Sequence, residues 1–188
     1  MPSYYLDCET DREGRDKPNP MKDKIITITF QKIEEETGNS IGKLNILKSW
    51  ESSEKNILYN FLQKTGWLEN PPMQWSFIPI GCNLKFDLMI IYHRTKEILN
   101  YDLDLEFLFY LLPKIDIKPI LTIANRGKFK GASLDKFSNK SNSGLLAYNL
   151  IQQKKWKKLL KYIKEETKSF LEIYQILLAN LPILLKKS

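Results

Sequence analysis

The chain has 188 residues, of which 43% are hydrophobic and 12% aromatic, enough apolar material for one folded domain and too much for a disordered chain. Its net charge of +7 and pI of about 9.2 favour a polyanionic partner, nucleic acid before a membrane surface. The longest apolar stretch, residues 170–185, is interrupted by polar residues and a proline, which makes it too short and too polar to cross a bilayer. We therefore expect a single domain over residues 1–188 and no membrane partner.

Cysteine and histidine usage argues against a disulfide framework or a zinc site. Cys8 and Cys82 each lie in an apolar segment, so both are interpreted as small buried side chains in a reducing compartment. His93 is the one histidine, so no Cys/His cluster has zinc spacing. The N-terminal sequence does not have the pattern of a signal peptide, because acidic residues follow Leu6 directly. These features predict a cytoplasmic protein.

The first 50 residues predict three antiparallel strands. Residues 4–9 form the first, and a polar loop with two prolines follows over 11–23. Residues 24–33 alternate isoleucine with threonine, a strong strand pattern. The chain turns over 34–40 and returns as a third strand over 42–50. Short connections between consecutive strands indicate an antiparallel meander.

The next segment predicts a helix and then a strand. Ser52 or Ser53 is expected to cap a helix that carries an apolar stripe and ends at Gly66. Residues 75–82 are apolar and predict a buried fourth strand. Pro79 interrupts this segment, which indicates a strand end or a sheet edge there.

The remaining chain continues this alternation. We expect helices over 86–99 and from 102 or 104 to 113, a fifth strand over 114–123, a short helix near 133–137 and a helical region over 145–185. This order predicts an α/β domain with a mixed five-stranded sheet, in which three antiparallel strands precede strands that alternate with helices, and helices flank the sheet.

Two carboxylates lie one residue apart in the first strand. Successive side chains of a strand alternate faces, so Asp7 and Glu9 project from the same face. Neighbouring carboxylates repel each other, and a hard divalent cation relieves that repulsion. The pair therefore predicts a Mg²⁺ or Mn²⁺ site, with a solvated acidic strand end as the alternative.

Two further segments carry candidate site residues. After the fourth strand the chain turns at Asn83, and Asp87 falls in the first turn of a helix, where a carboxylate either caps the helix or faces a ligand. In the last long helix, Tyr162 and Glu166 are four residues apart and share a face. This pair can orient a water beside a metal, or the tyrosine can simply pack along its helix.

These segments together resemble the DEDD superfamily of 3′–5′ exonucleases, which have the ribonuclease H-like fold. The motifs that carry the resemblance occur in the family's order, as Asp7-x-Glu9, Asn83-x-x-Phe86-Asp87 and Tyr162-x-x-x-Glu166. The Tyr subgroup is the most similar, and it includes the proofreading domains of family B DNA polymerases and ribonuclease D. The resemblance covers roughly residues 4–174.

The resemblance implies two divalent ions, Mg²⁺ or Mn²⁺, and a two-metal hydrolysis. The implied metal ligands are Asp7, Glu9, Asp87 and Glu166. Tyr162 would orient the attacking water, because a tyrosine with an ordinary pKa near 10 is a poor base at neutral pH. The residues expected to contact the substrate are Thr10, Asn83, Phe86, Arg126, Lys128, Lys130 and Lys161.

Basic residues are concentrated in two places. Arg126, Lys128 and Lys130 lie in a glycine-containing loop suited to phosphates. From residue 151 onward there are nine lysines and three glutamates, which carry +6 of the net +7. These lysines, Lys161 among them, either bind phosphates or form a solvated helix face.

One position departs from the family's pattern. The family has aspartate where this chain has Glu166, and Glu165 is a rival ligand about 100° around the helix. Tyr162, four residues before Glu166, favours Glu166. The His subgroup has a histidine five residues before the acid, where this chain has Lys161.

We therefore expect a metal-dependent 3′–5′ exonuclease that acts on the 3′ ends of single-stranded nucleic acid, with DNA slightly favoured over RNA. The alternative is a catalytically weak or inactive module on the same fold that binds nucleic acid or a protein partner. A pure binding module has no need for clustered carboxylates near phosphates, which argues against this alternative. The tyrosine and Asn-x-x-Phe-Asp patterns argue against an endonuclease or a transposase-like protein.

Overall fold

The computed structural model describes residues 2–69, 72–73, 75–137 and 144–185. It contains a five-stranded sheet with the strand order β3-β2-β1-β4-β5. The strands are β1 (Ser3–Asp11), β2 (Lys24–Ile33), β3 (Ser40–Lys48), β4 (Ile78–Gly81) and β5 (Ile115–Asp116). The first three strands pair antiparallel, whereas β4 is parallel to both β1 and β5. The predicted mixed five-stranded sheet of an α/β domain is therefore confirmed.

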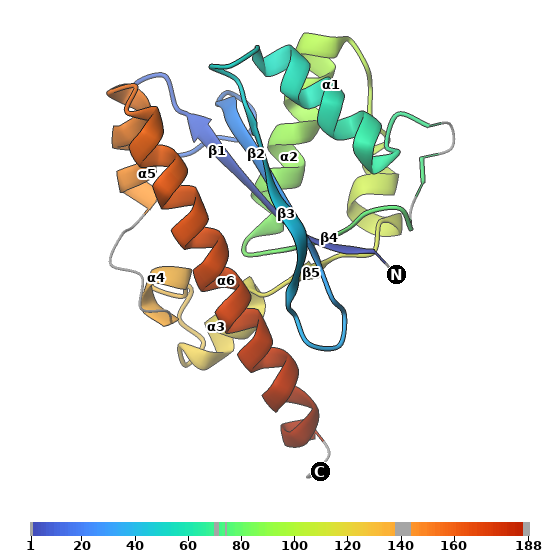
Figure 1. The fold of residues 1–188 in the computed structure, drawn as a ribbon, viewed down its shortest axis with the longest axis vertical. Helices are drawn as coiled ribbons and strands as arrows, with labels where there is room; N and C mark the ends of the chain where they lie inside the picture. The colour runs from blue at the N-terminus through green and yellow to red at the C-terminus, as the bar shows by residue number, and fades with distance from the viewer. Residues whose placement is uncertain (1, 70–71, 74, 138–143, 186–188) are drawn as a thin grey trace.

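Helices flank this sheet on both faces (Figure 1). The α-helices are α1 (Glu54–Thr65), α2 (Leu84–Arg94), α3 (Lys118–Ala124), α4 (Leu134–Phe137), α5 (Gly144–Gln152) and α6 (Trp156–Leu185). Two π-helical segments follow α2, namely η1 (Thr95–Leu99) and η2 (Phe107–Leu111). Among the residues that the structure describes, no helix combines the length and the apolar character that crossing a membrane requires.

The alternation of β1 decides which side chains meet which helices. Leu6 and Cys8 are buried in a core cluster with residues of α1 and α2. Tyr5 points to the opposite face, where its ring lies 4.6 Å from that of Phe170 in α6. Because side chains alternate along a strand, the acidic residues that follow Tyr5 at odd positions also lie on the α6 face.

The capping prediction for α1 is confirmed at both ends. Ser53, rather than Ser52, is the N-cap residue, and its side chain accepts a hydrogen bond of 3.1 Å from the backbone N–H of Asn56. Gly66 ends the helix with φ of 74°, a left-handed conformation that glycine adopts without a steric penalty.

The predicted fifth strand over 114–123 is wrong over most of its length. Only Ile115–Asp116 form a strand, and Lys118–Ala124 form α3. The Asp116 carboxylate accepts a hydrogen bond of 2.9 Å from the backbone N–H of Lys118, and Pro119 lies in the first turn, where a helix tolerates proline. These two residues start a helix in a segment whose apolar content resembles a strand.

Other elements differ from the prediction in extent. The fourth strand begins only at Ile78, and Pro79 is its second residue, at a strand end as predicted but not at a sheet edge. Pairing between β4 and β5 begins at Ile80, so the missing N–H of Pro79 costs no ladder bond to β5. The helical region over 145–185 is interrupted between α5 and α6, where Lys154 has φ of 51°.

The helix predicted over 86–99 is α2 continued by the π-helical segment η1. The helix predicted from 102 or 104 to 113 is short and largely π-helical. Asp104 is the residue that caps it, because its carboxylate accepts hydrogen bonds from the backbone N–H groups of Glu106 and Phe107.

Candidate metal centre

Three carboxylates meet where the helix α6 crosses β1. Asp7 and Glu9 come from β1 and Glu166 from α6, and each offers an oxygen within 4.8 Å of the oxygens of the other two. All three side chains are half-buried. The two-residue spacing on the strand puts Asp7 and Glu9 on the α6 face. The angular position of Glu166 around the axis of α6 directs its side chain toward them.

A fourth carboxylate, Asp87, lies beside this group in the first turn of α2. It is only 5% exposed and accepts a hydrogen bond of 2.9 Å from the backbone N–H of Cys8. The pairing of β1 with β4 ends at Tyr5, which leaves the Cys8 N–H available for this bond. Burial, and after it the negative charge of Asp7, raise the pKa of Asp87 well above its ordinary value.

Tyr162 is buried on the same side of α6 as Glu166, and the two side chains are hydrogen bonded. Burial, reinforced by the charges of Glu9 and Glu166, raises the pKa of the Tyr162 phenol above its ordinary value. The phenol therefore keeps its proton at neutral pH. It can hold a water or a carboxylate in place, but it cannot act as the base.

The donor set fits a hard divalent cation. Every candidate ligand is a carboxylate oxygen, the type that Mg²⁺ and Mn²⁺ prefer. The acidic cluster can therefore hold a divalent metal ion.

A left-handed residue and a hydrogen bond from its backbone N–H define the turn between β4 and α2. Asn83 has φ of 69°, and its backbone N–H donates a hydrogen bond of 2.8 Å to the carboxylate of Asp116. Its side chain makes no capping bond and is exposed, and Phe86 is half-buried one turn further on. Asp116, which the sequence placed within a long strand, instead ties this turn to the start of α3.

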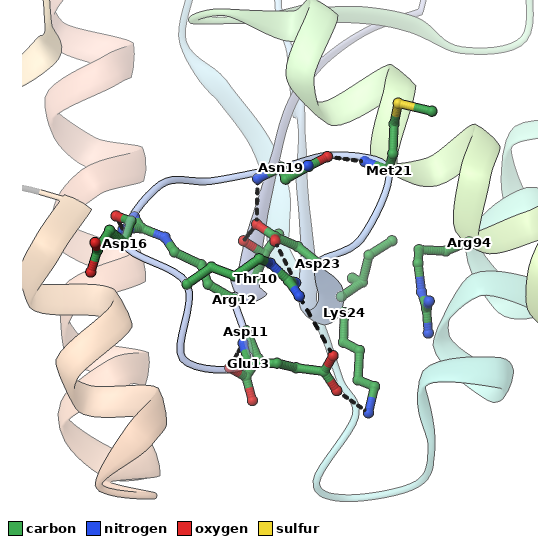
Figure 2. A network of polar contacts seen from close by, with 12 residues as sticks. Thr10, Asp11, Arg12, Glu13, Asp16, Asn19, Met21, Asp23, Lys24 and Arg94 are labelled. Carbon is green, nitrogen blue, oxygen red and sulfur yellow. Dashed lines mark hydrogen bonds and ion pairs between the residues drawn. The ribbon is translucent and has the colours of Figure 1, made fainter.

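The loop after β1 is organised by a buried aspartate that the sequence analysis did not single out. Asp23 is 0% exposed, and its carboxylate accepts hydrogen bonds from the Thr10 hydroxyl (3.3 Å), the Asn19 backbone N–H (3.0 Å) and the Arg15 guanidinium (3.0 Å). Figure 2 shows Asp23 between Thr10 and Asn19. Thr10, expected to contact substrate, is thus also part of this loop's internal support.

The four basic residues expected to contact the substrate are all exposed. Arg126, Lys128 and Lys130 are exposed on the loop after α3, which Asn125 holds by donating side-chain hydrogen bonds to the carbonyls of Lys128 and Lys130. The Lys161 side chain is 80% exposed and lies 3.7 Å from Glu165. Glu165 is therefore an outward-facing partner of Lys161, and the carboxylate that reaches the centre is Glu166.

Two threonines beside the carboxylates were also missed. Across the antiparallel ladder, Thr29 lies opposite Asp7 and Thr27 opposite Glu9. The Ile/Thr alternation of residues 24–33 shows that these threonines share a face. The register that places them opposite the carboxylates is visible only in the structure.

No family model matches the chain, and no curated protein matches its sequence. Solved structures match its fold. The structure of E. coli exonuclease I in complex with a dT13 oligonucleotide superimposes with a TM-score of 0.64 and 10% identity, over 100% of this chain and 43% of that chain. A complex of exonuclease I with SSB-Ct gives a TM-score of 0.51 and 10% identity, over 88% of this chain and 43% of that chain.

These comparisons establish the class of fold. The chain has a ribonuclease H-like α/β fold, which exonuclease I also shows. It spans less than half the length of the exonuclease I chains that it matches.

Proposed function

We propose that this protein is a metal-dependent 3′–5′ exonuclease of the DEDD superfamily, in its Tyr subgroup. It hydrolyses phosphodiester bonds at the 3′ end of single-stranded nucleic acid, with DNA favoured over RNA. The observation that carries the proposal is the meeting of Asp7, Glu9 and Glu166 within 4.8 Å, with Tyr162 bonded to Glu166. The likeness in fold to a protein crystallised with dT13, together with the net charge of +7, supports a single-stranded DNA substrate.

The carboxylates would hold two divalent ions, Mg²⁺ or Mn²⁺. When bound, such ions activate water for attack and stabilise the charge that develops on the leaving 3′-oxygen. Asp7, Glu9 and Glu166 form the open part of the site because they are half-buried and converge. Asp87 supplies a fourth carboxylate from the buried side, and its bond to the Cys8 N–H fixes β1 between the two ligands that flank Cys8.

Tyr162 orients the water that attacks the phosphorus. The hydrogen bond between its phenol and Glu166 sets the direction of the hydroxyl, and its burial restricts the rotation of the ring. Because the phenol stays protonated, the proton of the water leaves through the carboxylates or the solvent rather than through Tyr162.

The test uses 5′-labelled single-stranded DNA and RNA of one sequence, incubated with the pure protein in Mg²⁺, Mn²⁺ or EDTA. The proposal predicts a ladder that shortens from the 3′ end, requires metal and disappears in Asp7→Ala. That variant should remain folded by circular dichroism, since it removes a charge from a repulsive cluster. Glu165→Ala is the matched control, because Glu165 is adjacent to Glu166 but faces outward, and it should keep full activity.

The outcome also separates the proposal from its alternative. Absence of cleavage with either metal, together with retained binding of the oligonucleotide, would identify a binding module on the same fold. The aspartate-to-glutamate departure at Glu166 is the specific feature that makes this alternative worth testing. The relative cleavage rates on DNA and RNA identify which of the two sugars the protein prefers.

A further inference from the structure

Two threonines of β2 have buried hydroxyls that the fold does not use. Thr27 and Thr29 are both 0% exposed. Neither side-chain oxygen has a hydrogen-bond partner among the residues that the structure describes. Most buried polar groups in proteins are hydrogen bonded, because an unpaired buried group has lost its water without a replacement.

The position of these hydroxyls is specific. In the β1–β2 register, Thr29 is the direct partner of Asp7 and Thr27 the direct partner of Glu9. Directly opposed residues of an antiparallel pair project from the same face, with Cβ atoms about 4.5–5.5 Å apart. Each of the two β1 carboxylates of the candidate centre therefore has a buried hydroxyl directly across the ladder.

Folding alone does not account for a hydroxyl at either position. Valine has nearly the same shape, favours strands at least as strongly and carries no polar atom to desolvate. The hydroxyls are adjacent to carboxylates, which can accept hydrogen bonds but never donate them when ionised. A threonine hydroxyl can donate, so the pairing is chemically complementary.

We propose that Thr27 and Thr29 are positioning residues of the metal centre. Each hydroxyl donates to the carboxylate across from it when that carboxylate is drawn into coordination, and so holds Glu9 and Asp7 in the orientation that binds a cation. This inference rests on the proposed function, because it requires that the carboxylates hold a divalent ion. Residues that hydrogen bond to metal ligands in this way contribute roughly 10–100-fold to metal affinity.

The chain offers a matched control in Thr95. Its hydroxyl is also 0% exposed and also lacks a partner among the described residues. It lies at the start of η1, eight residues beyond Asp87 along a continuous helical segment, which corresponds to about 12 Å. Thr95 therefore shares the burial of Thr27 and Thr29 but not their position opposite a carboxylate.

The experiment measures Mn²⁺ affinity by titration calorimetry without nucleic acid, and thermal unfolding in EDTA, for Thr27→Val, Thr29→Val and Thr95→Val. All three variants should be at least as stable as the wild type in EDTA, because each loses an unpaired buried hydroxyl. Thr27→Val and Thr29→Val should bind Mn²⁺ about 10–100-fold more weakly, whereas Thr95→Val should bind it as the wild type does. Thr27→Ser, which restores the hydroxyl, should recover most of the affinity.

Each other result overturns the inference. If the wild type binds Mn²⁺ and the valine variants bind it equally well, the threonines have no positioning role, and the metal centre stands without them. If the wild type binds no Mn²⁺, the metal centre itself is wrong and the inference falls with it. A valine variant that fails to fold in EDTA would show that the hydroxyl serves the metal-free fold, contrary to the inference.

Discussion

The glycine at the end of β4 controls how closely that strand approaches the strand that carries the carboxylates. A Cβ atom on Gly81 would lie 2.8 Å from the backbone oxygen of Leu6 and 2.7 Å from Cδ2 of Leu84. The leucine side chain can turn away, but the Leu6 oxygen belongs to the backbone of β1, one residue before Asp7. Gly81→Ala must therefore displace β1, β4 or both.

The size of the effect follows from this overlap. Forcing an additional methyl group into a well-packed interior costs about 1–3 kcal/mol. For a protein of this size, each kcal/mol lowers the unfolding temperature by roughly 2–4 °C, so the loss should be about 2–12 °C. Because the displaced backbone leads directly to Asp7, the affinity for Mn²⁺ should fall as well.

The assay pairs thermal unfolding in EDTA with Mn²⁺ titration and includes Gly42→Ala as the control. Gly42 has φ of 73°, and a Cβ atom added to it would meet no atom within 4 Å, so alanine there costs about 1–2 kcal/mol of backbone energy without touching the centre. It should lower stability and leave Mn²⁺ affinity unchanged. A Gly81→Ala protein with wild-type stability and wild-type Mn²⁺ affinity would refute the argument that this close contact positions β1.

Three further substitutions test the roles assigned to individual side chains. Glu166→Asp introduces the residue that the DEDD superfamily has in this motif but shortens the side chain by one methylene, so the proposed function predicts reduced but measurable 3′-end cleavage; an inert, folded variant would show that the longer side chain is required. Tyr162→Phe removes the phenol that is hydrogen bonded to Glu166, so we expect Mn²⁺ to bind about 10–100-fold more weakly and kcat at saturating metal to fall; an unchanged kcat there would contradict its orienting role. Because the pKa of Asp87 is raised in the folded protein, the folded state binds this proton more tightly than the unfolded state does. In EDTA, protonated Asp87 therefore stabilises the fold below the unfolded pKa of about 3.9. This stability is lost as the pH rises through the pKa of Asp87 in the folded state. Asp87→Asn should therefore raise the unfolding temperature at neutral pH and flatten its decline above about pH 4, and an unchanged profile would show that ionised Asp87 is not destabilising.

Local patterns in the sequence predict the fold well where one short segment decides its own structure. The Ile/Thr alternation predicts β2, and Ser53 and Gly66 mark the ends of α1. The segment over 114–123 shows where this fails, because a short apolar run fits a strand and a buried helix equally well. There the Asp116 carboxylate starts the helix by accepting a hydrogen bond from the backbone N–H of Lys118, a contact that the apolar pattern does not reveal.

Local sequence patterns predict the candidate site less well than they predict the strands and helices. Asp7 and Glu9 could be placed on one face of a strand, but their meeting with Glu166 was inferred from a resemblance, since no local rule relates β1 to a helix so distant in the chain. Thr27 and Thr29 depend on the cross-strand register and could not be placed from sequence. Lys161, expected near the substrate, is on the outward side of α6, a result that its position 100° from Tyr162 already indicates.

The helix α6 carries side chains of the candidate metal centre and a row of exposed lysines on different faces. Tyr162 and Glu166 face the sheet, whereas exposed lysines recur along the other side with the spacing of one helical face, at Lys157, Lys161, Lys164 and Lys168. Salt weakens the attraction of such exposed lysines for phosphates more than it weakens interactions of the half-buried carboxylates. The proposed function therefore predicts two separate effects, loss of nucleic-acid binding at high salt and loss of hydrolysis in EDTA, and only the second would report on the carboxylate centre. Cleavage assays of the variants should for this reason be made at low ionic strength and at saturating substrate, so that changes in binding through the outward lysines do not conceal changes at the centre.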